Sequence, residues 1–156
     1  MSVSSRLLIA SLFLAAWLGA ALLTVAVVAP GAFAVLPTRT MAGEMVGRVL
    51  SAVFVSGLVL GIAVALAAGA GRASPGGAIT ALLASAACAV AYFGINPRIA
   101  QLRADIGGAV DLLPIEDPRR VAFGLLHGYS VAGLGVAMLS AALSLAFLLF
   151  ALRPRP

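Results

Sequence analysis

The sequence predicts an all-α integral membrane protein, a bundle of four transmembrane helices. Hydrophobic residues make up 63% of the 156 residues and charged residues only 10%, and the mean hydropathy is +1.16. A soluble domain of this length cannot bury so much apolar surface, so the bilayer must solvate part of it. The charged residues also leave four long uncharged intervals. These cross the hydrocarbon core as helices, because a helix satisfies its own backbone hydrogen bonds.

The arginines set the limits of these intervals. A spanning helix needs about 20 apolar residues, so each interval holds one span and none holds two. The intervals are 7–38 (32 residues), 49–71 (23), 73–97 (25) and 121–152 (32). We predict spans over about 7–29, 49–69, 78–96 and 122–151, with an amphipathic or loop segment over 97–120, in a single domain that covers residues 1–156.

The first span has some features of a secretory signal peptide, because Arg6 precedes an apolar run that contains small residues near Ala15. The apolar run continues without a break from Leu7 to Val28. This is well beyond the roughly 7–15 residues of a signal-peptide core. We therefore expect the segment to be retained as the first helix.

Proline, glycine and one acid mark the expected ends of the helices. Pro30 and Gly31 follow the first span, and the segment 74–77 (Ser-Pro-Gly-Gly) predicts a tight turn between the second and third spans. Asp117 has the position of an N-cap, with Pro118 at the first helical position of the fourth span.

Three of the helices are expected to continue past the bilayer. Ile99, Leu102 and Ile106 recur at helical spacing, which carries the third helix as far as Gly107–Gly108. The first and last intervals would each form about 48 Å of helix, against a hydrocarbon core of about 30 Å. We predict that helices one and four project or bend at the end that holds Pro30.

Four spans place both ends of the chain on one side of the membrane, here called side A, together with the turn around Arg72. Side A carries four arginines and no acid, whereas side B carries six arginines and all five acids. The positive-inside rule counts basic residues alone and favours side B as cytoplasmic, but the first helix usually dominates and begins at Arg6. We favour both termini in the cytoplasm, in an inner membrane of the bacterial type.

Small residues predict where helices pack closely. Gly57 and Gly61 lie one turn apart on the second span, and Gly124 and Gly128 do so on the fourth. Close backbone approach through such ridges drives much of the association of helices in lipid, where the hydrophobic force between helices is weak. We expect both ridges to pack within the bundle, and the alternative is a dimer interface.

The polar residues within the spans gather in the side-B half. Polar groups in a membrane usually face the bundle interior or a water-filled cavity. Asn96 and His127 should therefore point into the bundle within reach of each other, with Arg98 at the mouth. Trp17 falls near mid-span, so its indole N–H needs an internal partner. The predicted ligand-binding cluster consists of Arg48, Tyr92, Asn96, Arg98, His127 and Ser130.

Each of these residues also has a plain structural interpretation. His127 lies close enough to the interface to be merely hydrated, Arg48 could extend to the headgroups, and Asn96 could cap the third helix. One histidine and one cysteine do not make a metal or haem site, so we expect no metal and no cofactor. The excess of arginine at the membrane edges favours anionic lipid headgroups as partners over nucleic acid.

Three motifs stand in a fixed order along the chain. They are Trp17-Leu-Gly19 leading to Val28-Ala-Pro30-Gly-Ala-Phe33, Asn96-Pro97-Arg98-Ile99 followed by Leu102-Arg103, and Phe123-Gly-Leu-Leu-His127-Gly-Tyr-Ser130. In their order and spacing, over residues of about 10–150, the chain resembles domain-of-unknown-function family 4149, the relatives of transmembrane protein 205. The resemblance implies a four-helix membrane protein and, by analogy only, a resistance-like role.

Two classes of function remain open. In the first, the side-B cluster binds or transports a small polar or anionic ligand. In the second, the protein is a non-catalytic accessory or scaffold subunit, in a homo-oligomer or a larger membrane complex. No catalytic motif is recognisable, so we do not expect an enzyme. In the first class, charge would come from Arg48, Arg98 and Arg103, and directional hydrogen bonds from Asn96, His127 and Ser130.

Overall fold

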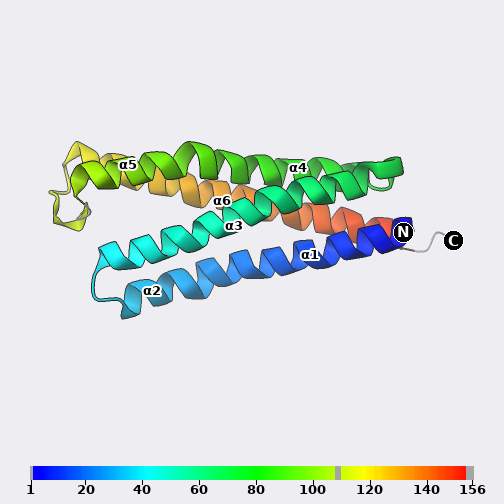
Figure 1. The fold of residues 1–156 in the computed structure, drawn as a ribbon, viewed down its shortest axis with the longest axis horizontal. Coiled ribbons are helices and arrows are strands. Elements are labelled where there is room, and N and C mark those ends of the chain that lie inside the picture. Colours follow the sequence, from blue (N-terminus) through cyan, green and yellow to red (C-terminus); the bar gives the residue numbers. More distant parts are fainter. Residues whose placement is uncertain (1, 108–109, 154–156) are drawn as a thin grey trace.

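The computed structural model describes residues 2–107 and 110–153, and within them four long helices form an antiparallel bundle (Figure 1). The first helix consists of α1 (Val3–Leu23), the π-helical η1 (Thr24–Val28) and α2 (Ala29–Val35), and the second is α3 (Arg39–Gly69). The third consists of α4 (Pro75–Ala89), the π-helical η3 (Val90–Ile95) and α5 (Asn96–Ile106), and the fourth is α6 (Pro118–Ala151).

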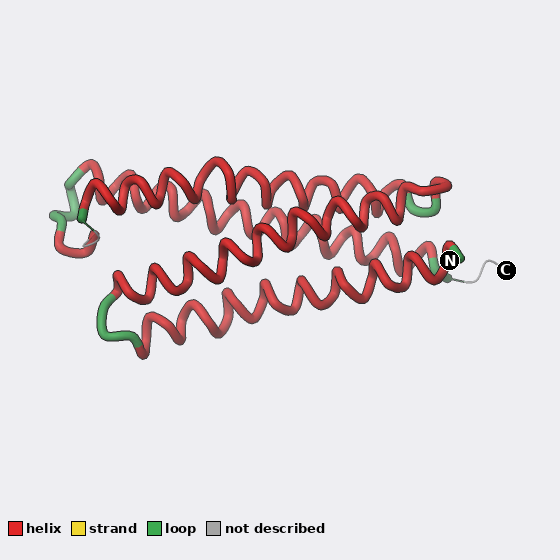
Figure 2. The backbone as a smooth tube through the Cα atoms, viewed as in Figure 1, coloured by secondary structure: helices red, strands yellow, loops and turns green. Residues whose placement is uncertain are grey.

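All four helices are long and apolar enough to cross a membrane, which confirms the predicted class of fold. They contain 33, 31, 32 and 34 residues, or about 46–51 Å of helix against a hydrocarbon core of about 30 Å. The start of α1, the α3–α4 connection and the end of α6 lie at one end of the bundle, which is side A (Figures 1 and 2). The α2–α3 turn and the loop before α6 lie at the other end, side B.

The second helix begins at Arg39, so it extends beyond the predicted span of 49–69 toward side B. Thr38 is its N-cap, and the Thr38 hydroxyl accepts a hydrogen bond from the backbone N–H of Met41 at 3.2 Å. The predicted turn over 74–77 is also shifted, because α4 already begins at Pro75. The chain reverses instead through the short 3-10 helix η2 (Ala70–Arg72), where Arg72 adopts a positive φ of 57°.

The side-B loop follows the predicted helix ends. The third helix ends at Ile106, and Gly107 takes the left-handed conformation (φ 78°) that favours glycine at a helix C-terminus. Gly108 lies outside the described residues. A second 3-10 helix, η4 (Val110–Leu112), follows, and Asp117 caps α6 with Pro118 at its first position.

Both π-helical segments directly precede a proline. The N–H of Ala29 donates to the carbonyl of Thr24, five residues earlier, and Pro30 follows. The N–H of Asn96 donates to Ala91 in the same way, ahead of Pro97. A proline ring has no N–H and clashes with the carbonyl four residues back, so one wider turn admits it without ending the helix. The π-helical turns near side B therefore occur in the first and third helices, whereas the fourth helix, α6, is α-helical throughout.

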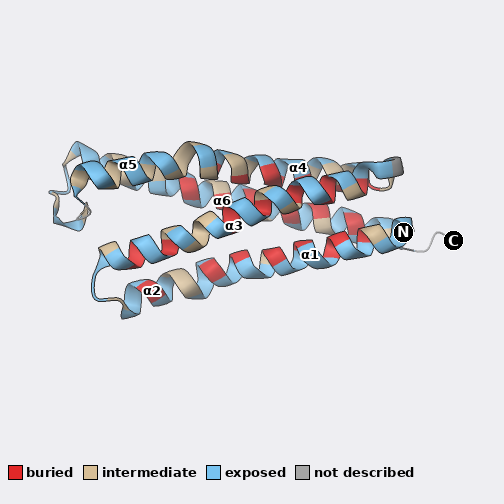
Figure 3. Ribbon diagram, in the orientation of Figure 1, coloured by how far each residue is buried: buried red, intermediate tan, exposed pale blue. Residues whose placement is uncertain are grey.

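The bundle core consists mainly of small side chains, whereas many large apolar side chains are exposed. Buried and exposed positions alternate along each helix (Figure 3). Among the described residues, eleven of the 21 buried hydrophobic side chains are alanines. Buried serines connect the helices through their neighbours' backbones. Ser85 donates to the carbonyl of Leu58, and Ser144 donates to that of Gly77, both at 2.8 Å.

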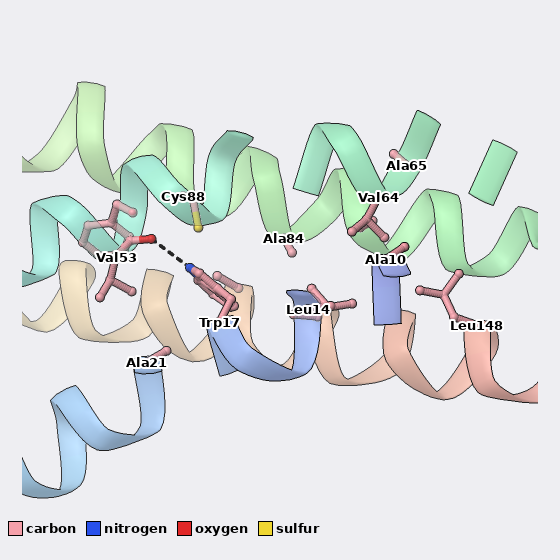
Figure 4. Close-up of a cluster of buried hydrophobic side chains, with 14 of the residues drawn as sticks. Ala10, Leu14, Trp17, Ala21, Val53, Val64, Ala65, Ala84, Cys88 and Leu148 are labelled. Atoms are coloured by element: carbon pink, nitrogen blue, oxygen red, sulfur yellow. Dashed lines mark hydrogen bonds between the residues drawn. The ribbon is translucent and has the colours of Figure 1, made fainter. Parts of the chain in front are cut away.

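The ridge on α3 packs against α1 and α4 at the level of Trp17. The Trp17 indole N–H donates to the carbonyl of Val53 at 3.0 Å, which confirms the need for an internal partner (Figure 4). A Cβ on Gly57 would lie 2.6 Å from Cζ2 of Trp17 and 2.8 Å from Sγ of Cys88. A Cβ on Gly61 would lie 2.8 Å from the Ala81 carbonyl oxygen. Only glycine fits at these two positions without displacing a neighbouring helix.

The ridge on α6 does not pack within the bundle, which corrects the prediction for Gly124 and Gly128. Both residues are exposed, and no atom of another element lies within 4 Å of where their Cβ would be. The buried face of α6 follows Ser130, Leu134 and Ala137 instead. Gly128 is two residues, or about 200°, away from Ser130 on the helix, so the small-residue ridge faces outward.

Candidate ligand-binding site

A cavity of about 570 Å³ lies at side B, where the α2–α3 hairpin diverges from α5 and α6 (Figure 1). Apolar side chains such as Phe33, Leu50 and Phe123 form part of its wall. Its charged and polar lining residues come from α3, α5, η4 and α6. They are Arg39, Thr40, Glu44, Arg48, Ser51, Asn96, Arg103, Asp111, His127 and Ser130.

Four of the six residues predicted for the ligand-binding cluster line this cavity, and they are Arg48, Asn96, His127 and Ser130. The other two, Tyr92 and Arg98, do not line it. Arg98 is exposed and lies two residues after Asn96, about 200° around α5. Tyr92 belongs to η3, packs against the bundle core, and meets Phe93 edge to face with ring centroids 4.9 Å apart. The mouth position assigned to Arg98 is therefore wrong.

Arg103 takes the place that the prediction gave to Arg98. It follows Asn96 by seven residues, so the two side chains share one face of α5. Ile99 and Ala100, at intermediate helical spacing, line the cavity as well. This spacing of 0, 3, 4 and 7 residues places the four residues on one face of α5, and the packing of the helices decides that this face, rather than the face of Arg98, lines the cavity.

Asn96 contacts α3 rather than His127. Its side-chain amide Nδ2 donates to Oγ of Ser51 at 3.3 Å, and the Ser51 hydroxyl donates to the carbonyl of Gly47 at 2.9 Å. The described part of the chain shows no direct hydrogen bond between Asn96 and His127, although both line the cavity. The His127 side chain is exposed and stacks parallel to Phe123, with ring centroids 6.5 Å apart.

Arg103 is held between three helices. It extends from α5 so that its Cζ lies 5.2 Å from the centroid of the Phe123 ring on α6, a cation–π contact. On the other side, the guanidinium lies next to Gly43 of α3: a Cβ added to Gly43 would be only 2.5 Å from Nη2 of Arg103. Gly43 is buried, and any side chain there would collide with the guanidinium. The guanidinium thus has a defined position across the cavity wall.

The charges that line the cavity are not neutralised by direct pairing. Three arginines (39, 48 and 103) and two carboxylates (Glu44 and Asp111) line it. Within residues 2–107 and 110–153, the one ion pair within 4.0 Å joins Arg119 to Asp117, and neither residue lines the cavity. The same residues contain no group of three or more metal-ligating side chains. The arrangement is suited to binding an anion.

Hydrogen bonds connect the loop before α6 to the first turn of α6. The Asp117 carboxylate accepts hydrogen bonds from the Arg119 guanidinium at 2.9 and 3.2 Å and from the Arg119 backbone N–H at 2.8 Å. These hydrogen bonds hold the pKa of Asp117 below its usual value. Arg120 donates to the carbonyl of Leu113 at 2.6 Å, which ties the segment after η4 to α6.

The lining residues of 39–47 precede the predicted span of 49–69, and only Arg48 of this part of α3 was predicted to belong to the ligand-binding cluster. Thr40, Gly43, Gly47 and Ser51 all line the cavity. Their spacing of three, four and four residues indicates one face of a helix. Together with the Thr38 cap, this spacing is the signal that could have extended the second helix to Arg39.

These features define a class, a small integral membrane protein of four helices with an arginine-lined cavity at one end. The chain belongs to the family described as Domain of unknown function (DUF4149), whose model matches residues 12–107. No curated protein and no solved structure matches the chain. The matched segment contains the first two sequence motifs and the residues of α5 that line the cavity. The third motif, with His127 and Ser130 on α6, lies beyond it.

Proposed function

We propose that the protein binds or transports a small polar or anionic ligand in the side-B cavity. The observation that carries the proposal is the convergence of Arg48, Arg103 and the Asn96–Ser51 pair on one cavity of about 570 Å³. Pockets that bind small molecules have volumes of this order, with mostly apolar walls and a few placed polar groups. Arginines without a carboxylate partner favour an anion in that setting.

The position of the cavity supports access from water. It is formed by the side-B parts of helices that are longer than the hydrocarbon core. Polar ligands can therefore reach it without crossing the bilayer. For the protein as a whole, we propose a bacterial-type inner membrane with both termini in the cytoplasm, which places the cavity on the opposite side.

Ligand-induced stabilisation of the purified protein tests this proposal. A ligand that binds the folded state raises the unfolding midpoint by mass action. A panel of small anions and polar metabolites is screened in a phosphate-free maltoside detergent against the wild type, Asn96→Ala and His127→Ala. Arg98→Ala is the matched control, because Arg98 is exposed on α5 but outside the cavity lining.

Asn96→Ala should weaken binding of a hit about 5- to 10-fold, the value of one hydrogen bond. Arg98→Ala should bind as the wild type does. Equal stabilisation of Asn96→Ala, His127→Ala and the wild type by every hit would contradict the proposal.

The second candidate function is an accessory subunit in a homo-oligomer or larger membrane complex. One observation favours it, the exposed ridge of Gly124 and Gly128 on α6. Such ridges allow close helix approach in lipid. Gly128→Leu should then abolish a detergent-resistant oligomer seen by crosslinking, whereas Gly19→Leu should not, since a Cβ on Gly19 also meets nothing within 4 Å. A wild type that is monomeric in lipid nanodiscs would remove this candidate.

A further inference from the structure

We propose that the side-B cavity binds a singly charged phosphate ester and that Arg103 is its positioned cation. This inference rests on the proposed function and narrows the ligand from any small polar or anionic molecule to one chemical group. The group can be supplied by a soluble phosphodiester or by the headgroup of a phospholipid, and the experiment below distinguishes these sources.

The geometry around Arg103 is that of a prepared anion site. The Arg103 side chain is only partly exposed, and its Cζ lies 5.2 Å from the centroid of the Phe123 ring on α6. Gly43 leaves the space that the guanidinium occupies on the α3 side. A long side chain loses rotamer freedom when it orders around a ligand, so prior fixation between two helices lowers the entropic cost of binding.

The number and type of cations favour a phosphate over a carboxylate. Three arginines line the cavity, and the chain contains no lysine. A guanidinium presents parallel N–H donors that match two oxygens of a phosphate or carboxylate. One such fork pairs with both oxygens of a carboxylate. A phosphodiester also has two charged oxygens, and its two ester oxygens add weaker acceptors for a second arginine. The Asn96 amide and the His127 ring supply further polar groups at the same wall.

The two carboxylates in the lining limit the charge of the ligand. Arg39, Arg48 and Arg103 contribute three positive charges, and Glu44 and Asp111 contribute two negative ones. The formal charges of these five side chains sum to +1. A phosphodiester monoanion matches this balance, and the second charge of a phosphomonoester dianion would be repelled by the acids. The apolar wall with Phe33, Leu50 and Ile99 fits the organic part of an ester.

The experiment measures binding of four probes to the full chain in a phosphate-free maltoside detergent. Glycerophosphoglycerol is the soluble phosphodiester, and phosphatidylglycerol carries the same headgroup on a lipid. Glycerol 3-phosphate represents a dianionic monoester, and succinate represents a carboxylate. Calorimetry serves the soluble probes and native mass spectrometry serves the lipid.

Two glycine variants make the test specific for Arg103. Gly43→Ala places a methyl group where the guanidinium lies, and a flexible side-chain end can move aside, so the variant should fold. Gly124→Ala makes the same change on α6, at an exposed position outside the cavity lining where a Cβ meets nothing within 4 Å. Arg103→Gln removes the charge itself. We expect about 10- to 100-fold weaker diester binding for Arg103→Gln, about 5- to 10-fold for Gly43→Ala and less than about 2-fold for Gly124→Ala.

The outcomes separate this inference from the broader proposal. Binding of glycerophosphoglycerol identifies a soluble phosphodiester, and binding of phosphatidylglycerol alone identifies a lipid headgroup. Either result, with the expected order of variants, supports the inference. Equal weakening by Gly43→Ala and Gly124→Ala, or succinate or glycerol 3-phosphate binding as tightly as the diester, would overturn it. If neither diester binds while another ligand depends on Asn96, the inference fails and the proposed function stands.

Discussion

Replacing Gly57 with alanine should loosen the bundle at the contact between α1, α3 and α4. The new methyl group would lie 2.6 Å from Cζ2 and 2.8 Å from Cε2 of Trp17, and 2.8 Å from the sulfur of Cys88. Trp17 is only 7% exposed and its ring is fixed by the hydrogen bond to Val53. No flexible chain end is available to move aside, so the helices themselves must shift.

The expected loss of stability follows from three contributions. Overpacking a well-filled core costs about 1–3 kcal/mol. A shift of the indole that breaks its bond to Val53 leaves a buried N–H donor unpaired, at a cost of about 1–3 kcal/mol. Alanine offsets about 1 kcal/mol of this through its higher helix propensity. The net destabilisation by Gly57→Ala should be about 1–5 kcal/mol, with a midpoint of about 3 kcal/mol.

Gly124→Ala is the matched control for this prediction. The chemical change is the same, but a Cβ there meets nothing within 4 Å and the position is exposed. Only the propensity contribution remains, so this variant should be unchanged or more stable by up to about 1 kcal/mol. At the midpoint for Gly57→Ala, the folded-to-unfolded ratios of the two variants should therefore differ by roughly 100-fold or more.

The assay is reversible unfolding in mixed micelles with fluorescence detection. Trp17 is the only tryptophan in the chain, so its emission reports directly on the contact with Gly57. In a Trp17→Phe background, read by circular dichroism, the cost of Gly57→Ala should fall by about 1–2 kcal/mol, because the smaller ring relieves the overlap. The reasoning would be refuted if Gly57→Ala were as harmless as Gly124→Ala and left the Trp17 emission unchanged.

Three further predictions concern topology, core access and pH. Single cysteines introduced at the exposed positions Ala70 and Leu112 should be labelled by impermeant reagents from opposite sides of the membrane, and labelling of both from one side would contradict the four-span topology. Native Cys88 is buried, so it should resist maleimide until the protein unfolds, and rapid labelling of the folded protein would count against the described core. Because the pKa of Asp117 is lowered in the folded protein, its stabilisation of the start of α6 is complete above the ordinary aspartate pKa of about 3.9. That stabilisation is lost as the pH falls through the lower folded value. Relative to the intrinsic exchange rate at each pH, the protection of the first turn of α6 against hydrogen exchange should therefore fall in acid, and Asp117→Asn should remove this change.

The sequence predicted the number of helices and most of their ends, because charge and hydropathy are strong signals in a bilayer. Asp117, Pro118 and Gly107 act through local backbone rules and were placed correctly. The start of α3 at Arg39 was missed because charged residues at 39–48 were interpreted as the limit of a span. A helix that projects into water does not end where its apolar residues end.

The candidate site was less predictable, since it depends on how helices face each other. Residues that carry polar groups near side B could be named, but spacing alone did not separate Arg103 from Arg98 until the face of α5 was known. Glycine ridges show the same limit. Gly57 and Gly124 sit in equivalent patterns, yet Trp17 fills the space at one and nothing fills it at the other. Which helix packs against a glycine ridge depends on the tertiary structure, and the spacing of residues in a single sequence does not reveal it.

The alanine-rich core has a thermodynamic consequence. Large apolar side chains such as Leu12, Phe13 and Phe150 are more than 60% exposed in the bundle, where lipid replaces water around them. Separating the helices within a bilayer therefore brings little new apolar surface into contact with water. The heat-capacity change of that step should be far below the roughly 12–15 cal/mol/K per residue of soluble proteins, so its free energy should vary almost linearly with temperature. A bundle of this kind would have a broad range of working temperatures and no pronounced optimum of stability.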